Sequence, residues 1–476
     1  MRAGLSRRGL GLGAWAARFL PSRLTALLTA PLAALFTALF TACTTTPPWL
    51  PAGTQDAAAA TVTGDDLIVV AVADRPEPRP VAGSAPRAGY VRSAGYAGSD
   101  QALARADRVA GEHGLQELKA WTIPALNWRC MLYRLPAGVP RAQALARLRA
   151  DPQVQLAQAL NSFETLATPL AKLPSTLPTN LPTNLPNTAA GATHSRLYND
   201  PYLPLQLGFI AIDAASAQRV TRGEGVAVAV IDTAVDTRHP DLQGRISTSR
   251  DFVGRTVIGE RHGTEVAGII AATANNGIGI VGVAPGARLH SFRACWSVPD
   301  AAAARCNSFT LAQALSAAIT AGVDIINLSL GGPRDPLLEQ LLQQAMAQGI
   351  VVVAALPPGG RREGFPTAVP GVLAVAASED GAPAAGLLAA PGRRILTLAP
   401  GGGYDYASGS SLASGHVSGA VALLRALDRR LDSATLNRLL GSDLNPASPS
   451  IDACRALQRL DARTAGTLPT ACAATR

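Results

Sequence analysis

The chain has 476 residues, of which 48% are hydrophobic and only 4% are aromatic, and its formal net charge is +9. This length is enough for two or three domains with a sizeable core. Nearly all of the positive charge is arginine, and it is scattered, with no basic run outside the N-terminus. Because nucleic-acid binding needs basic residues clustered on one face, the composition argues against a nucleic-acid partner.

Residues 1–42 have the order of an export signal. Five arginines precede an apolar stretch, Leu24–Ala42, which is long enough to cross a bilayer and ends at Cys43. The letters FTAC resemble the lipobox of bacterial lipoproteins, although Phe40 stands where that motif usually has leucine. A lipid-anchored protein, a cleaved signal and a retained signal anchor all stay open. Each predicts an exported protein, and the favoured location is a membrane-anchored one in the bacterial envelope, in the periplasm or at the outer membrane.

Three regions follow the signal. Residues 43–65 predict a disordered tether, residues 66–165 a small domain, and residues 166–198 a proline-punctuated linker with almost nothing to bury. The small domain is predicted as strand, helix, two strands, helix and strand, which is the ferredoxin-like order of an α+β domain. Its first strand is expected at Leu67–Ala73, and its last is expected to be continuous over 154–166.

Residues 199–476 predict an α/β domain with a doubly wound, mostly parallel sheet. Continuous apolar runs alternate with helical segments, which is typical of strands covered by helices on both faces. The expected strands lie at 225–232, 323–330, 349–356 and 371–378.

The six cysteines suggest two local disulfides. An exported chain meets an oxidising compartment, in which cysteines that are close in sequence pair readily. Cys295 and Cys306 flank one short segment, Cys454 and Cys472 flank another, and Cys130 is left over. Six reduced and buried cysteines are the alternative.

Three motifs in the α/β domain carry reactive side chains. Asp232 ends a predicted buried strand, His262 opens a predicted helix, and Ser411 lies at the start of another. A serine hydroxyl becomes a strong nucleophile when an imidazole takes its proton, and a buried carboxylate holds that imidazole in the correct tautomer. The three residues can therefore act as nucleophile, base and orienting acid.

These motifs resemble those of the subtilases, the subtilisin-like serine proteases. The resemblance covers about residues 199–460 and includes VAVIDTAVDTRHPDL, RHGTEVAGIIAA, INLSLGG and SGSSLASGHVSG. It implies that Asp232 orients His262, that His262 is the general base, and that Ser411 attacks peptide bonds of a polypeptide substrate to form an acyl-enzyme.

The resemblance also implies where substrate binds and what the first domain does. Ser329, Leu330 and Gly331 would form the edge that pairs with an extended substrate. Secreted subtilases carry a ferredoxin-like prodomain that blocks the cleft until it is cut away. The chain's own residues 66–165 would then be an intramolecular inhibitor of a zymogen, and an unrelated binding domain is the alternative.

A structural Ca²⁺ is a further implication of the resemblance. Family members hold the ion with oxygen ligands from a residue near the domain's start, the HPDL motif and the loop after the histidine helix. In this sequence the matching ligands are Asp200, Asp241 and the Asn276 side chain, with backbone carbonyls of Ala274, Ile278 and Ile280.

One departure from the family pattern concerns the oxyanion. In subtilases the strand equivalent to VVVAA leads to an asparagine whose amide donates to the tetrahedral intermediate, but here Pro357 and Pro358 follow, and neither has a donor. The Ser411 N–H remains, and Ser410, Gly359, Gly360, Arg361 and Arg362 are candidates for a second donor. We therefore expect a slow or specialised endopeptidase, and the alternative is a pseudoprotease that binds peptides in the subtilase cleft.

Overall fold

The structure is a computed structural model that describes residues 64–74, 99–167, 197–254, 257, 259–381, 383–442, 444, 449–463 and 472. The predicted signal peptide and nearly all of the predicted tether and linker lie outside these residues. Within the described part of the chain, no helix has both the length and the apolar character that a membrane span requires. All of the described residues belong to one compact unit, Gly53–Arg476.

The first domain is a four-stranded antiparallel sheet with two helices, in the predicted ferredoxin-like order. Its central strand β1 is buried on both faces because side chains alternate along a strand. Ile68 and Val70 pack with α3 and α4, whereas Leu67 and Val69 belong to an apolar cluster that includes Phe309 of the second domain. The bounds are β1 Leu67–Ala73, α3 Asp100–His113, β2 Gln116–Ile123, β3 Trp128–Arg134, α4 Arg141–Ala150 and β4 Val154–Ala159.

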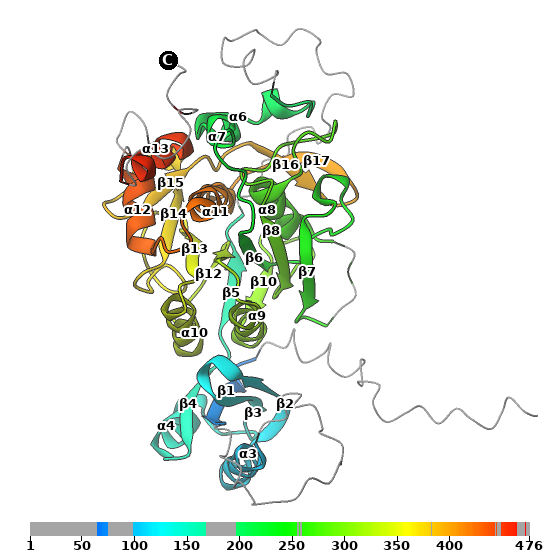
Figure 1. The fold of residues 1–476 in the computed structure, drawn as a ribbon. Coiled ribbons are helices and arrows are strands. Elements are labelled where there is room, and N and C mark those ends of the chain that lie inside the picture. The colour runs from blue at the N-terminus through cyan, green and yellow to red at the C-terminus, as the bar shows by residue number, and fades with distance from the viewer. Residues whose placement is uncertain are drawn as a thin grey trace, which may run out of the picture. The chain divides into compact units, whose positions relative to one another are not determined.

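The second domain contains a seven-stranded parallel sheet in the order β15-β14-β13-β11-β6-β8-β7 (Figure 1). This arrangement confirms the predicted doubly wound α/β fold. The strand order reverses direction between β6 and β11, and ligands of such sheets bind at the carboxyl ends of strands next to this switch. The strands are β6 Ala227–Asp232, β7 Ile246–Asp251, β8 Arg288–Arg293, β11 Ile325–Leu328, β13 Val351–Ala355, β14 Leu373–Ala377 and β15 Leu388–Ala390.

Helices cover both faces of this sheet, which explains why its strands are continuously apolar. Val228 and Val230 of β6 share a core with α8 and α11, and Ala229 and Ile231 of the same strand share another with α9 and α10. The helices are α6 Leu207–Ala211, α7 Ala214–Ala217, α8 Arg261–Ala271, α9 Ser308–Ala321, α10 Pro336–Ala347, α11 Ser410–Leu427, α12 Ser433–Gly441 and α13 Ala453–Arg463. A separate hairpin pairs β16 Ile395–Ala399 with β17 Gly403–Ala407.

The prediction of one strand over 154–166 is wrong. The chain leaves the first sheet after β4 and forms a second strand, β5 Ser162–Thr165, which pairs with β12 Leu330–Gly331 and β10 Arg305–Asn307 of the second domain. A further strand, β9 Cys295–Trp296, pairs with β10 and completes this small antiparallel sheet. The C-terminal segment of the first domain is therefore part of a sheet built by the second.

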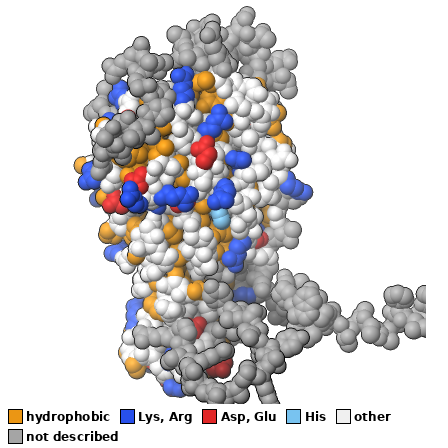
Figure 2. Space-filling model, viewed as in Figure 1, with side chains coloured by type: hydrophobic (Ala, Val, Ile, Leu, Met, Phe, Trp, Pro, Cys, Tyr) orange, Lys and Arg blue, Asp and Glu red, His pale blue; other side chains and the backbone are white. Residues whose placement is uncertain are grey.

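Both predicted disulfides are present, Cys295–Cys306 and Cys454–Cys472, and Cys130 is free and buried. On the face drawn in Figure 2, Lys and Arg side chains lie among hydrophobic, acidic and uncharged ones.

Candidate active site

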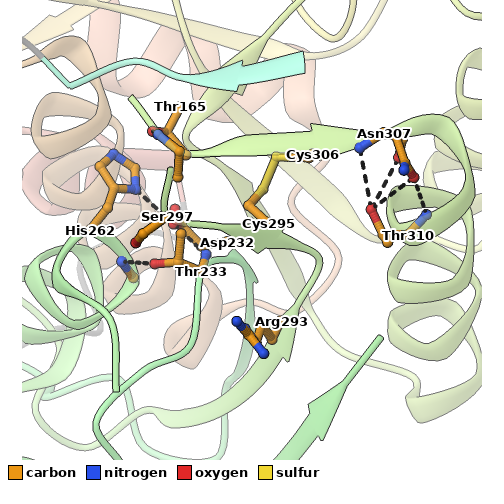
Figure 3. Close-up of a disulfide and its surroundings, with 12 residues drawn as sticks. Thr165, Asp232, Thr233, His262, Arg293, Cys295, Ser297, Cys306, Asn307 and Thr310 are labelled. Atoms are coloured by element: carbon orange, nitrogen blue, oxygen red, sulfur yellow. Dashed lines mark hydrogen bonds and ion pairs between the residues drawn. A yellow bond between two sulfur atoms is a disulfide. The ribbon is translucent and has the colours of Figure 1, made fainter. Parts of the chain in front are cut away.

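Asp232 and His262 are brought together by the end of β6 and the first turn of α8. His262 Nδ1 lies 2.6 Å from Asp232 Oδ1 (Figure 3). Asp232 is fully buried, and the backbone N–H of Thr233 donates to the same Oδ1 over 2.6 Å. A carboxylate that accepts from Nδ1–H leaves the opposite ring nitrogen, Nε2, as a proton acceptor. This pair has the geometry of a base and its orienting acid.

The charges around His262 raise its pKa. Burial by itself lowers the pKa, but the charge of Asp232 and its hydrogen bond, together with the charge of Glu265, outweigh burial. Glu265 lies one turn further along α8, is 5% exposed, and pairs with Arg261 over 2.6 Å. Arg261 also pairs with Asp405 over 2.8 Å. Glu265 therefore contributes to the electrostatics of the base.

Close packing fixes α8 against the end of β6. The Gly263 N–H donates to Thr233 Oγ1 over 2.9 Å. A Cβ at position 263 would lie 2.4 Å from the Thr233 carbonyl oxygen, a separation that side chains do not tolerate. Glycine at this position lets the helix that carries His262 approach the strand that carries Asp232.

Ser411 lies in the first turn of α11, which packs against α8, and is fully buried. Its hydroxyl donates to the carbonyl oxygen of Leu166 over 2.9 Å. His262 Nε2 is buried and has no hydrogen-bond partner among the described residues. The serine hydroxyl is therefore bonded to Leu166 and not to the imidazole, and it must turn toward Nε2 before His262 can take its proton.

The segment that ends at Leu166 occupies the edge that the sequence assigned to substrate. Thr165 is the register partner of Leu330, and the Leu166 N–H donates to the Ser329 carbonyl over 3.0 Å. A Cβ on Gly409, the residue two before Ser411, would lie 2.3 Å from the Leu166 carbonyl oxygen and 3.1 Å from Ala167 Cα. Gly409 also has a positive φ of 149°. Leu166 and Ala167, which the sequence assigned to the linker, thus lie against the nucleophile.

A buried polar network connects this edge to α11. The Ser329 hydroxyl lies 3.0 Å from Ser414 Oγ and accepts from Asn327 Nδ2 over 2.9 Å. Ser418 Oγ in turn donates to Asn327 Oδ1 over 2.9 Å. Because each group has a partner, the network holds the end of β11 and the nucleophile helix in one arrangement.

The structure gives most of the proposed second oxyanion donors other partners. The Ser410 hydroxyl donates to the Leu356 carbonyl over 2.6 Å, so its assignment as a donor to substrate is not supported by this geometry. The Gly360 N–H donates to Pro357 O over 3.1 Å, Arg362 Nη2 donates to Val372 O over 2.6 Å, and Arg361 pairs with Glu363. The Ser411 N–H, in the first turn of a helix, belongs to the set that finds no acceptor within the helix.

The predicted calcium ligands lie together at the loop after α8. Asp241 is fully buried, and its carboxylate accepts from Asn276 Nδ2 over 2.7 Å and from the Ile280 N–H over 2.9 Å. Asp200 is 4% exposed and accepts from the Asn276 N–H over 3.4 Å. Burial raises the pKa of both carboxyl groups, although these donors oppose the rise. Ala274 and Ile278 belong to the same loop.

The oxygen atoms of these residues fit a hard cation. Two buried carboxylates face only amide and hydroxyl donors in the hydrogen bonds described for them, and buried anionic charge of this kind is stabilised by an oxygen-coordinated metal ion such as Ca²⁺. Among the described residues, no group of three or more His, Cys, Asp or Glu side chains is arranged for metal binding. A bound ion would therefore depend on amide and backbone carbonyl oxygens as well as on Asp200 and Asp241.

The other side of the cleft is formed by residues that the sequence did not indicate as functional. The Thr165 N–H donates to Ala304 O over 3.0 Å, and the Ala304 N–H donates to Thr165 Oγ1 over 2.9 Å. Phe163 is 1% exposed and packs edge-on against Phe365, with ring centroids 5.6 Å apart. The only sequence signal for this side was the pair of cysteines around residues 296–305, which suggested a staple and not a binding edge.

Residues 223–451 match the model of the Subtilase family. An intracellular serine protease of Paenibacillus polymyxa is 38% identical over 242 residues, which are 46% of this chain and 72% of that protein. Thermitase of Thermoactinomyces vulgaris is 32% identical over 281 residues, 55% of this chain and 99% of thermitase. Subtilisin E of Bacillus subtilis (strain 168) is 36% identical over 240 residues, 47% of this chain and 61% of that protein.

A solved structure is similar over most of the chain. Fervidolysin from Fervidobacterium pennivorans, described as a keratinolytic enzyme related to subtilisin, aligns with a TM-score of 0.62 at 22% identity. The alignment covers 86% of this chain and 63% of fervidolysin. At this identity the likeness supports the fold alone.

Proposed function

Because the chain belongs to the subtilase family of serine proteases, we propose that it is an exported serine endopeptidase made as a zymogen that processes itself. The observation that carries the proposal is the Leu166 peptide group at the nucleophile: its carbonyl oxygen lies 2.9 Å from Ser411 Oγ, and its N–H is held by Ser329. The segment before Leu166 is extended and paired on both sides, as a bound substrate would be.

The proposed reaction follows from these positions. Ser411 Oγ attacks the carbonyl carbon of Leu166 while His262 Nε2 takes the hydroxyl proton, and Asp232 stabilises the imidazolium. Collapse of the tetrahedral intermediate breaks the bond between Leu166 and Ala167, and His262 gives the proton to the Ala167 nitrogen. A water molecule then gives a proton to His262 and attacks the ester carbonyl carbon. His262 passes this proton to Ser411 Oγ as the bond to Leu166 breaks, which leaves Leu166 with a free carboxylate.

The first self-cleavage would therefore separate Leu166 from Ala167. The released residues up to Leu166 keep their contacts with β10 and β12, so the first domain inhibits the cleft after cleavage as well as before it. Polypeptides are the proposed external substrates, and they compete with this segment for the same edge.

Turnover is proposed to be slow. The two prolines remove the usual side-chain donor, and four of the five candidates for a second donor, Ser410, Gly360, Arg361 and Arg362, have other partners. The Ser411 N–H at the helix start and the Gly359 N–H remain as candidate donors. Loss of one oxyanion donor lowers turnover by about 10²–10³-fold in subtilisin. Enzymatic acceleration of at least about 10⁶-fold leaves measurable activity after such a loss.

The same observation favours a second candidate function. If the missing donor abolishes the chemistry, the chain is a pseudoprotease whose cleft binds extended peptides, and its own residues 162–166 are the first such ligand.

Calcium and export complete the proposal. Asp200, Asp241 and Asn276, with carbonyls of the 274–280 loop, would hold a structural Ca²⁺ that neutralises the two buried carboxylates and stabilises this loop.

Residues 1–43 support export and attachment to a bacterial envelope membrane, through a lipid on Cys43 or a retained signal anchor. The scattered arginines support the absence of a nucleic-acid partner.

The experiment that tests this function follows the size of the chain, expressed without its signal, by intact-mass spectrometry. We expect a break between Leu166 and Ala167 in the parent and none in Ser411→Ala. A fluorophosphonate probe, which reacts with activated serines, should label the parent alone. A folded parent that stays intact and unlabelled supports the pseudoprotease instead.

A further inference from the structure

The strand β10, which forms one side of the peptide cleft, is very short and is held by a disulfide. β10 has three residues and β9 has two, and Cys306 and Cys295 are directly opposite each other in the ladder. Both cysteines are buried, and Figure 3 shows their bond between the strand beside Asp232 and the strand beside Thr165.

β10 and the residue before it, Ala304, contact every residue of the peptide segment from 162 to 165. Cys306 is the register partner of Phe163, Arg305 that of Glu164, and Asn307 that of Ser162, while Ala304 exchanges hydrogen bonds with Thr165. Leu166 is held instead by Ser329. The disulfide-linked strand and Ala304 therefore bind residues 162–165, which precede Leu166, but not Leu166 itself, whose carbonyl is attacked.

Without a peptide beside it, β10 is held at its C-terminal end by Asn307, the buried N-cap of α9, whose side chain accepts from the Thr310 N–H over 2.9 Å. Its remaining ladder partner is β9, and the two strands are joined by the segment 297–304. An isolated two-stranded hairpin is marginally stable in water even when it is longer than this one. A covalent link between opposite residues restricts the conformations that such a hairpin can adopt when the cleft is empty.

The other end of the link is fixed to the catalytic framework. Ala294, next to Cys295, donates its N–H to the Asp232 carbonyl over 2.8 Å. The buried Arg293 donates to Glu260 over 2.9 Å, and the same carboxylate accepts from the Ser297 N–H over 2.8 Å. Cys295 therefore lies between two residues that are tied to the carboxylate preceding the His262 helix.

We propose that the Cys295–Cys306 disulfide is a positioning element for extended substrates: it holds β10 in register with the catalytic sheet, so that the cleft is preformed for the second to fourth residues before the cleaved bond. It takes no part in bond cleavage. The proposal rests on the proposed function only in treating the cleft ligand as a substrate, because residues 162–166 already occupy the site as a ligand.

The first test does not need catalysis. The full chain without its signal is prepared as Ser411→Ala, and hydrogen–deuterium exchange is compared between Cys295→Ala/Cys306→Ala and the matched control Cys454→Ala/Cys472→Ala. Removing both halves of a bridge leaves no new thiol to pair with Cys130. We expect exchange in segments 162–166 and 304–307 to accelerate by about tenfold, the equivalent of one weakened hydrogen bond, only in the first variant.

Unchanged exchange in these segments, or equal acceleration in the control, overturns the proposal. If the alanine pair does not fold, Cys295→Val/Cys306→Val supplies a buried cross-strand pair without the covalent link, and the same comparison decides.

The second test separates binding from chemistry. Hydrolysis of acetyl-Phe-Glu-Thr-Leu p-nitroanilide is compared with that of acetyl-Leu p-nitroanilide, which is too short to reach β10. Because the first domain's segment competes for the same edge, we expect removal of Cys295–Cys306 to weaken the segment and the long substrate alike. Hydrolysis of the short substrate should then rise about tenfold, while KM for the long substrate should stay within a few-fold of its original value. An equal fall in kcat/KM for both substrates indicates that the disulfide is merely structural and overturns the proposal. A parent that hydrolyses neither substrate refutes the proposed function, and the exchange experiment still decides the role of the disulfide.

Discussion

Phe163 is expected to be the main anchor that keeps the first domain's segment in the cleft. Its side chain is 1% exposed and packs against Phe365. Truncation of a buried phenylalanine to alanine costs about 3–5 kcal/mol, and the lower value applies here because water can enter the vacated side of a cleft. About 3 kcal/mol corresponds to an increase of roughly 100-fold in the fraction of molecules with an open cleft.

The neighbouring residue Glu164 is the matched control. It lies on the same strand, but its side chain is 61% exposed and its distance to Arg305 is 3.9 Å. An exposed ion pair of this kind contributes less than about 1 kcal/mol, so Glu164→Ala should change cleft opening by only a few-fold.

The assay is the rate at which a fluorophosphonate probe labels Ser411 in the full chain, because the probe reaches the serine only when the segment has left. We expect Phe163→Ala to label about 100-fold faster than the parent, and Glu164→Ala within a few-fold of it. If the two variants label at the same rate, burial of Phe163 does not hold the segment in place and the reasoning fails.

Three further predictions follow from the site. Pro357→Gly/Pro358→Asn restores a side-chain oxyanion donor and should raise kcat on a peptide p-nitroanilide by about 10²–10³-fold, the effect known for subtilisin; an unchanged kcat shows that another donor already acts. Glu265→Gln removes a charge that raises the pKa of His262. Because His262 must be neutral to accept a proton, the pH below which kcat/KM declines should be lower in this variant. An acid limb of kcat/KM that does not move contradicts the role of His262 as the base. Chelation of calcium should lower Tm by about 5–10 °C, the equivalent of about 2.7 kcal/mol of ligand stabilisation, but should change Tm little in Asp241→Asn; equal shifts in both proteins argue against this site.

The sequence by itself determined the parts of the protein that local patterns specify. Asp232 at the end of an apolar run, and His262 and Ser411 at the starts of helices, were predictable because small residues and helix-compatible segments surround them. The two disulfides were also accessible, since cysteines 11 and 18 residues apart meet without knowledge of the rest of the fold.

Only the tertiary structure decided which sheet each strand joins. Residues 154–166 read as one strand because alternation of side chains does not reveal a pairing partner, and the break after β4 is set by the edges that β10 and β12 present. The candidate oxyanion donors were also not predictable from the sequence alone. Ser410, Gly360 and Arg362 each carry a suitable N–H or O–H group, but their partners are carbonyl groups placed by packing. A sequence lists which groups can donate, whereas the fold decides which acceptor lies within hydrogen-bond distance of each of them.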